Sequence, residues 1–297
     1  MNLPHTTSAG PYRKPPLLAS EYPSLEFSYA GSADGIDQHL LILLHGLGDT
    51  HGNFMQFGKR MELPQTAVLA VGGPFRLVPD AAGSYRFDSS DVGGGSNSGG
   101  SVTGSSEDAW LVNGRTWVPS FHPDGREVDL SSLLGQTGLA TTRTLLLGLV
   151  RLCVRRWGVD RVLVFGFAQG GVVAVDLILA LAESDAVRVP VVSVCGWLPA
   201  PPHPSPSPPS TQQASVLIIH GENDVSISKE IQFKYEAYLR SRLPNKDSLK
   251  IARIPGKDHC LPGKDRNEMR HILAFFASHM ILRNIQLESM ADVYEVK

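Results

Sequence analysis

The sequence predicts an α/β fold built on a doubly wound, mostly parallel sheet. Six short runs of Val, Ile and Leu alternate with longer segments in which apolar residues recur at helical spacing. Continuous apolar runs are typical of strands that are buried on both faces of a parallel sheet. Their alternation with helices along the whole chain favours one doubly wound layer. A chain of 297 residues, 42% hydrophobic and 19% charged, is long enough for one such domain.

The expected strands share a buried, unbroken apolar character, and they are 39–44, 67–71, 161–165, 190–195, 215–219 and 249–254. The expected helices each carry one apolar stripe at intervals of three, four or seven residues. These stripes are Leu139, Leu146, Val150 and Val154; Val172, Val175 and Leu179; Ile231, Tyr235 and Leu239; and Met269, Leu273, Phe276 and Met280. Ligands of such sheets bind beyond the carboxyl ends of the strands, so the residues that follow each strand are the functional candidates.

The domain organisation is predicted from local composition. Residues 23–283 are expected to form one domain, preceded by a loose arm at 1–22 that is rich in Pro, Ser and Thr. A tail follows at 284–297. Two insertions are expected: a Gly/Ser-rich segment at about 88–116, which should be flexible, and a Pro-rich segment at about 199–212. A Pro-rich stretch can bind recognition domains, but a surface insertion is the preferred interpretation.

Charge and cysteine content narrow the function classes. The formal net charge of −2 provides no field that would favour nucleic acid or an anionic membrane as a partner. The three cysteines, Cys153, Cys195 and Cys260, are odd in number and far apart, which indicates neither a disulfide framework nor a zinc site. No secretory signal is expected. The apolar run 172–182 contains Asp176 and is too short for an integral membrane segment, so a cytoplasmic location is predicted.

The loop after the strand at 161–165 reads GFAQG at positions 166–170. This is the G-x-S-x-G pattern of a nucleophile elbow with Ala168 in place of the serine. In such an elbow the strand turns sharply into a helix, so the residue at 168 faces the crevice and the backbone N–H of Gln169 points at the same place. The alternative is an ordinary Gly-rich turn, because the residue that defines the motif is absent.

Two more loops contain candidate functional residues. The segment HGLGDT at 45–50 can place the N–H of Leu47 opposite that of Gln169, forming a two-donor oxyanion hole. Its first residue, His45, is expected to hold the loop rather than to shuttle protons. The segment HGEND at 220–224 supplies a carboxylate in the position of a catalytic acid, from either Glu222 or Asp224, although a solvated turn has the same composition.

The loop after the last strand reads GKDHC at 256–260. A histidine here completes the chain order nucleophile, acid, base, which makes His259 the candidate base facing position 168. Cys260 is a poor candidate for a thiol nucleophile, because its neighbour His259 should point to a different place. Cys195, near a strand end, is expected to be a small buried hydrophobic residue.

With these four loops in this order along the chain, the sequence resembles the acyl-protein thioesterase, phospholipase and carboxylesterase family of α/β hydrolases. The matching segments are LLHGLGDT at 43–50, FGFAQGG at 165–171, GWLP at 196–199, IIHGENDVSI at 218–227 and GKDH at 256–259. The resemblance implies the α/β-hydrolase fold with helices on both faces. It also implies hydrolysis of acyl esters or thioesters, including those of lipidated proteins, by a Ser-His-Asp triad without metal or cofactor. It assigns the base to His259, the acid to Asp224 rather than Glu222, the oxyanion donors to Leu47 and Gln169, and the nucleophile position to Ala168.

Ala168 has no oxygen that could attack a carbonyl, so no acyl-enzyme can form. The alanine is either an engineered change that traps a substrate or the natural residue of a non-catalytic relative. Three hypotheses follow: an impaired ester or thioester hydrolase, a ligand-binding or protein-interaction module, and a hydrolase in which His259 activates water directly. The two insertions prevent any transfer of substrate preference from the family. Trp117 is a further candidate for a place near the pocket.

Overall fold

The computed structural model describes residues 12–77, 114–184, 188–198, 214–243, 245–263 and 266–284. The two expected insertions lie outside these residues, apart from positions 114–116. Residues 1–11 of the expected arm and 285–297 of the expected tail also lie outside them.

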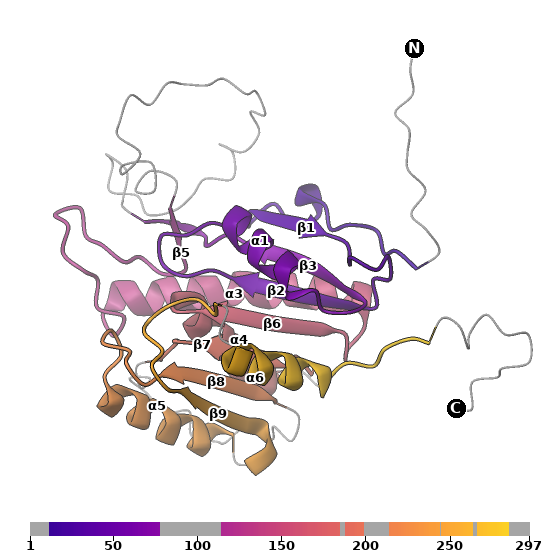
Figure 1. Ribbon diagram of the computed structural model, residues 1–297. Coiled ribbons are helices and arrows are strands. Elements are labelled where there is room, and N and C mark those ends of the chain that lie inside the picture. The colour runs from indigo at the N-terminus through magenta and orange to yellow at the C-terminus, as the bar shows by residue number, and fades with distance from the viewer. Residues whose placement is uncertain are drawn as a thin grey trace, which may run out of the picture.

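The centre of the fold is a seven-stranded sheet in the order β1-β3-β2-β6-β7-β8-β9 (Figure 1). Only β1 runs antiparallel to its neighbour; the remaining strands are parallel. The bounds are Phe27–Ala30 for β1, His39–Leu44 for β2, Thr66–Val71 for β3, Val162–Phe167 for β6, Val191–Val194 for β7, Val216–Gly221 for β8 and Leu249–Ile254 for β9. The six predicted strands are thus confirmed, with ends that differ by at most two residues. Sequence reasoning missed β1 and a small second sheet of β4 (Phe75–Arg76) and β5 (Arg115–Thr116).

Helices cover both faces of the sheet (Figure 1). On one face α1 and α6 pack against the strands around Phe54 and Phe276, and on the other α3, α4 and α5 form a larger core. The helix bounds are His51–Met61 for α1, Leu133–Trp157 for α3, Gln169–Ser184 for α4, Lys229–Arg242 for α5 and Arg266–Ala277 for α6, with short 3₁₀ turns at Ala19–Glu21 and Lys246–Ser248. The predicted doubly wound architecture is therefore confirmed.

The buried stripe of α6 differs from the predicted one. Leu273 is 37% exposed, and Met280 lies beyond the end of the helix. Phe276 is buried as predicted, and Met269 and Met280 pack partly buried against the same core, but the helix also buries Ile272 and Glu268, whose carboxylate forms an ion pair with a buried lysine. The buried face of the helix thus includes a charged side chain, which a search for apolar spacing cannot detect.

The described half of the N-terminal arm is packed, in contrast to the loose arm expected for 1–22. Leu17 is buried, and the Tyr22 hydroxyl donates a hydrogen bond of 2.6 Å to the Leu145 carbonyl of α3. The Lys14 ammonium donates to the Arg156 carbonyl in the last turn of α3, at 3.0 Å. Unpaired carbonyls at a helix end provide acceptors for such a segment.

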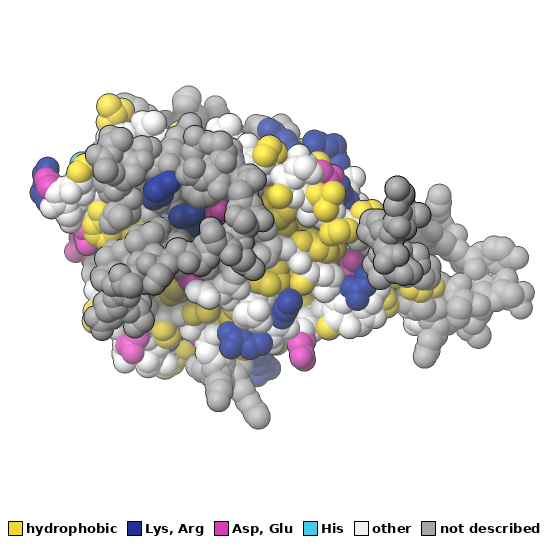
Figure 2. Space-filling model, turned by 90° about the horizontal axis from the view of Figure 1, so that it is seen from above, with side chains coloured by type: hydrophobic (Ala, Val, Ile, Leu, Met, Phe, Trp, Pro, Cys, Tyr) yellow, Lys and Arg dark blue, Asp and Glu magenta, His cyan; other side chains and the backbone are white. Residues whose placement is uncertain are grey.

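The helix α3 is long and apolar enough, by length and composition, to cross a membrane. In the structure it packs against α4, β2 and β6, and its Arg143 forms an ion pair with Asp176 of α4. A core helix of a globular domain passes the same test, and this packing accounts for the apolar composition. The face seen in Figure 2 carries basic and acidic side chains interspersed rather than in one block, in keeping with the small net charge.

Candidate active site

The turn between β6 and α4 has the sharp geometry of a nucleophile elbow. Ala168, the single residue between the two elements, has a φ of 48°, in the left-handed region. This conformation costs a residue with a side chain about 1–2 kcal/mol. The Ala168 N–H donates to the Val194 carbonyl at 2.8 Å, and the Ala168 carbonyl accepts from the Val172 N–H at 3.0 Å. The turn is therefore held by backbone contacts that do not involve the side chain at 168.

Glycines make this turn possible. A Cβ atom on Gly166 would lie 2.2 Å from the Gly170 carbonyl oxygen, and one on Gly170 would lie 2.2 Å from the Leu44 carbonyl oxygen. Both contacts are far closer than van der Waals distance and involve backbone atoms that cannot move aside. The start of α4 is thus packed directly on the end of β2, and only glycine fits at these positions.

The loop after β2 is held by His45, which is fully buried. Its Nε2 accepts a hydrogen bond of 3.0 Å from the Gly73 N–H, so its Nδ1 carries the proton and donates to the Gly46 carbonyl at 2.6 Å. Burial lowers the pKa of His45 to about 4. This ring is therefore neutral and structural, which agrees with the prediction that it holds the loop.

The next residues of this loop lie beside the elbow. A Cβ atom on Gly46 would lie 3.7 Å from that of Ala168, and Leu47 lines the same pocket as Ala168. Within the described part of the chain, no hydrogen-bond acceptor is found for the backbone N–H of Leu47 or of Gln169. Both residues that are predicted to carry the oxyanion donors therefore line the same pocket as position 168.

The Gln169 side chain fastens the elbow to the segment after β5. Its Oε1 accepts from the Trp117 N–H at 2.7 Å, and its Nε2 donates to the Ser120 hydroxyl at 3.1 Å. The indole of Trp117 is fully buried and donates to the His45 carbonyl at 2.8 Å. Trp117 therefore lies at the site, where it links the two loops that carry the backbone donors.

The loops after β8 and β9 bring together Asp224 and His259, the predicted acid and base. His259 Nδ1 lies 2.9 Å from Asp224 Oδ2, and the Asp224 side chain is only 1% exposed. The other carboxylate oxygen accepts the N–H groups of Ser226 and Ile227 at 2.9 and 3.0 Å. Glu222 is exposed, so the structure pairs the histidine with Asp224, the residue that the family resemblance favours. Because Nδ1 binds Asp224, Nε2 of the ring faces away from the carboxylate.

A buried ion pair supports the loop that carries His259. The Lys257 ammonium lies 2.9 Å from Glu268 Oε1, with both side chains at most 4% exposed, and it donates to the Cys260 carbonyl at 2.6 Å. Burial lowers the pKa of Lys257, but the hydrogen bond and the charge of Glu268 outweigh this and raise it. The loop is thus anchored on both sides of His259. Sequence reasoning did not single out Lys257, because no motif links it to a residue eleven positions along the chain.

A pocket of about 310 Å³ joins these elements. Its lining combines the proposed site residues with apolar walls: Leu47, Val118, Phe121, Leu130, Ala168, Gln169, Val172, Cys195, Trp197 and His259. The structure thus brings together Ala168, His259 and the two donor residues, with Asp224 behind the histidine.

Cys195 is buried, which agrees with the prediction, but it also lies at the site. It follows β7 with a φ of 52°, and its Sγ, the Asp224 carboxylate and a ring nitrogen of His259 lie within 4.8 Å of one another. A thiol, a carboxylate and an imidazole can hold a metal. Here the hydrogen bond between His259 and Asp224 already uses two of the three groups, and burial raises the pKa of Cys195 to about 12. These residues fit a hydrogen-bonded pair beside a neutral thiol better than a metal site. Cys260 is exposed, and its Sγ lies 3.6 Å from the Lys257 ammonium.

Comparisons with known proteins agree with this geometry. Residues 149–280 match the family model described as phospholipase/carboxylesterase. An uncharacterized hydrolase of Mycosarcoma maydis is 28% identical over 205 residues, which cover 66% of this chain and 63% of that protein. A second uncharacterized hydrolase, from Schizosaccharomyces pombe, is 43% identical over 42 residues, or 14% of this chain and 17% of that one. The chain thus spans less than two thirds of the length of the curated relatives it matches.

Solved structures show the same fold. Acyl-protein thioesterase 2 of Zea mays superposes with a TM-score of 0.60 at 16% identity, over 86% of this chain and 98% of that one. Esterase PE8 superposes with a TM-score of 0.59 at 18% identity, over 86% of this chain and all of that one. The described structure has the α/β-hydrolase fold, and residues 149–280 are similar to the phospholipase/carboxylesterase family.

Proposed function

We propose that this chain has an acyl-ester or thioester site of the carboxylesterase and acyl-protein thioesterase type, and that this site is silenced at position 168. One observation carries the proposal. Ala168 occupies a strained elbow in a pocket that also holds His259, and His259 is hydrogen-bonded to Asp224. The family match and the acyl-protein thioesterase among the similar structures support an ester or thioester as the ligand class.

The parts of the site have distinct roles in this proposal. The N–H groups of Leu47 and Gln169 receive the carbonyl oxygen of the ligand, where the start of α4 adds partial positive charge. His259 is the base, and Asp224 holds its ring in one tautomer and stabilises the charged form. With alanine at 168 no acyl-enzyme forms, so turnover falls on the order of a millionfold below that of an intact triad.

A second function follows from the same geometry: a ligand-binding module that does not catalyse. The turn at Ala168 stays in the left-handed region although it presents no nucleophile, and both backbone donors remain free of partners among the described residues. Such a site can bind an acyl ligand without converting it. A lipidated protein as ligand, a cytoplasmic location and the absence of a metal or cofactor remain predictions.

The test compares the present chain with its Ala168→Ser variant. Turnover is measured on p-nitrophenyl esters with acyl chains of two, four, eight and twelve carbons and on an acyl thioester. Each substrate is used over a series of concentrations up to ~1 mM that stays below its solubility limit. We expect turnover of the variant to exceed that of the present chain by at least about a thousandfold. The double variant Ala168→Ser, His259→Asn is the control and should return to the low rate.

Each outcome decides between the functions. A fast variant beside a silent chain supports a preserved site that lacks only its nucleophile. If the folded variant is inactive on every ester and thioester, the proposed base, acid and donors do not form a catalytic site. Enzyme-like turnover of the chain with Ala168 would show that the nucleophile lies elsewhere.

A further inference from the structure

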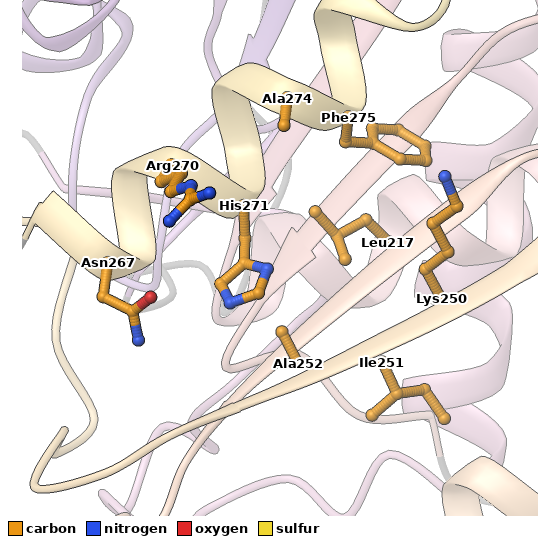
Figure 3. A pocket seen from close by; sticks show the side chains of 9 residues that line it. All are labelled: Leu217, Lys250, Ile251, Ala252, Asn267, Arg270, His271, Ala274 and Phe275. Atoms are coloured by element: carbon orange, nitrogen blue, oxygen red, sulfur yellow. The ribbon is translucent and has the colours of Figure 1, made fainter.

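We propose that the open edge of β9 binds an extended acidic segment of a partner protein, which adds a strand to the sheet. The binding surface is the cavity of about 360 Å³ between residues 250–252 of β9 and residues 267–275 of α6, called the β9 groove below (Figure 3). The residues that line this groove are different from those that line the pocket at Ala168. The inference is therefore independent of the proposed function and goes beyond it.

The backbone of β9 supplies hydrogen-bonding groups at this groove. β9 stands last in the strand order, and among the described residues it pairs only with β8. Alternate residues of such an edge strand direct their N–H and C=O groups away from the sheet. Three consecutive residues of β9, from Lys250 to Ala252, line the groove. An extended peptide that lies there can form a ladder of main-chain hydrogen bonds with β9.

Small side chains keep the groove open beside this edge. Ala252 of β9 and Ala274 of α6 both line it, and neither side chain extends beyond a methyl group. Leu217 and Phe275, each 3% exposed, add apolar surface to the lining. Every second side chain of an added strand points toward α6 and enters the groove. Glutamate fits this position, because its CH₂ groups can pack on the apolar surface while its carboxylate reaches the walls.

The charged side chains of the groove are basic. Lys250 of β9 and Arg270 of α6 line it, and no carboxylate does so among the described residues. Lysine and arginine side chains are cationic at neutral pH, and a histidine such as His271 offers a ring N–H in either protonation state. The whole chain has a formal net charge of −2. The β9 groove is thus a local basic surface on a slightly acidic protein.

The two cations lie at opposite ends of the groove. In Figure 3 the Lys250 side chain lies beside Phe275 at one end, and Arg270 and Asn267 project from α6 at the other. The Lys250 ammonium is 5.9 Å from the centre of the Phe275 ring. Five residues separate Phe275 from Arg270, which is about 7.5 Å along a helix. Side chains two positions apart on a strand are about 7 Å apart, so two such acidic residues match this spacing.

The same charges argue against a second copy of this chain as the occupant. A two-fold pairing of β9 edges brings identical surfaces together. It would add another Lys250 and another Arg270 to the groove, and no described lining residue would supply a carboxylate. Lysine on an edge strand is a common protection against unwanted strand pairing. This protection acts against basic and neutral strands, whereas an acidic strand is attracted by it.

The experiment measures peptide binding to the full chain by isothermal titration calorimetry at low ionic strength. The probe is a peptide of about eight residues in which Glu alternates with Val, the length of a common strand. One control peptide has Lys in place of each Glu, and a second keeps the Glu–Val sequence but carries a methyl group on every backbone nitrogen. We expect the acidic peptide to bind at least about tenfold more tightly than either control.

Charge-reversal variants test the basic side chains. Lys250→Glu and Arg270→Glu should each weaken binding of the acidic peptide by at least about fivefold, because attraction becomes repulsion. Both side chains are exposed, so the fold should tolerate the changes. Arg240→Glu is the matched control, since Arg240 is an exposed residue of α5 outside the groove, and it should leave binding within about twofold. Equal losses in the three variants would overturn the inference.

Hydrogen exchange locates the peptide. The amides of β9 should exchange at least about threefold more slowly with the acidic peptide bound, and those of β1 at the other edge should not change. Equal binding of the N-methylated peptide would overturn the inference, because charge alone would then suffice. Displacement of the peptide by ~10 mM inorganic phosphate at constant ionic strength would indicate a site for small anions instead. A dimer of the free chain that protects the β9 amides would assign the edge to a second copy.

Discussion

The loop after β6 and the loop after β9 meet at the same edge of the sheet, but they differ in what they retain. The first has the backbone geometry of a nucleophile elbow around Ala168 and carries a methyl group at the central position. The second keeps the side chain as well, since His259 is hydrogen-bonded to Asp224. The comparison teaches that the shape of the elbow is set by packing around its glycines and does not depend on the residue at 168.

The strain at Ala168 supports this conclusion. A left-handed conformation persists in a residue with a side chain only where the surrounding structure imposes it. Here the backbone bonds to Val194 and Val172, together with the contact between Gly170 and the end of β2, impose it. The loop after β9, which carries His259, is held differently, by a buried side-chain ion pair between Lys257 and Glu268. Substitutions should therefore affect the two loops in different ways.

The largest loss of stability is expected from Lys257→Met, in the loop after β9 that carries His259. Removing one partner of a buried ion pair leaves Glu268 buried without its counter-charge and should lower the free energy of unfolding by about 3–5 kcal/mol. Urea denaturation measures this value. Lys234→Met is the control, because the pair of Lys234 with Glu230 is about three quarters exposed and its removal should leave the free energy of unfolding nearly unchanged. Equal losses in the two variants would mean that the buried pair does not anchor the loop.

The elbow should respond most strongly to Gly170→Ala. The new methyl group would lie 2.2 Å from the Leu44 carbonyl oxygen and 2.4 Å from that of His45. Overpacking against backbone of this kind should cost about 3 kcal/mol in unfolding free energy. Gly263→Ala, where a Cβ atom meets nothing within 4 Å, serves as the control for thermal and urea denaturation. A Gly170→Ala variant as stable as this control would refute the packing argument.

Acidification should lower the stability of the fold, because buried histidines take up protons when the chain unfolds. Burial is the main cause that lowers the pKa of His39, His45 and His220 to about 4, from an ordinary value near 6.5. The unfolded chain therefore binds more protons than the folded one between these values. Stability is fully present above about pH 6.5 and is lost as the pH falls toward about 4, by on the order of 2 kcal/mol for each ring.

Urea midpoints at pH 7, 6, 5 and 4 measure this loss. His220→Phe is informative, because among the described residues neither ring nitrogen of His220 has a hydrogen-bond partner, and the replacement keeps an aromatic ring. On acidification this variant should lose less unfolding free energy than the unchanged chain, and the difference should correspond to the uptake of one proton. An unchanged pH dependence would show that His220 is not neutral in the folded state.

The smallest effect is expected from Ala168→Gly. Glycine relieves about 1–2 kcal/mol of left-handed strain but adds about 0.4–1 kcal/mol of unfolded-state entropy. The variant should thus be more stable by at most about 1.6 kcal/mol, as thermal denaturation can measure. A clear loss of stability would mean that the methyl group packs in the pocket more tightly than the strain costs.

Much of the site could be predicted because its residues lie directly after strands. The segments at 45–50, 166–170 and 256–260 combine small residues with the ends of apolar runs, and parallel strands carry such segments to one edge of a sheet. The contact of Lys257 could not be predicted in this way, and Trp117 could be named as a candidate near the pocket but without its hydrogen-bond partners. Each acts through a contact with a residue far along the chain, and no local pattern indicates such a partner.

By itself, the sequence determined the parallel sheet, the order of the loops and the absence of a nucleophile at Ala168, because strand burial and loop composition are local properties. Only the tertiary structure decided that Cys195 lies beside the pair of Asp224 and His259, and that α6 turns Glu268 rather than Leu273 inward. These choices depend on which side chains meet when strands from distant parts of the chain align. Packing and the pairing of buried charges determine such contacts, and both exist only in the folded molecule.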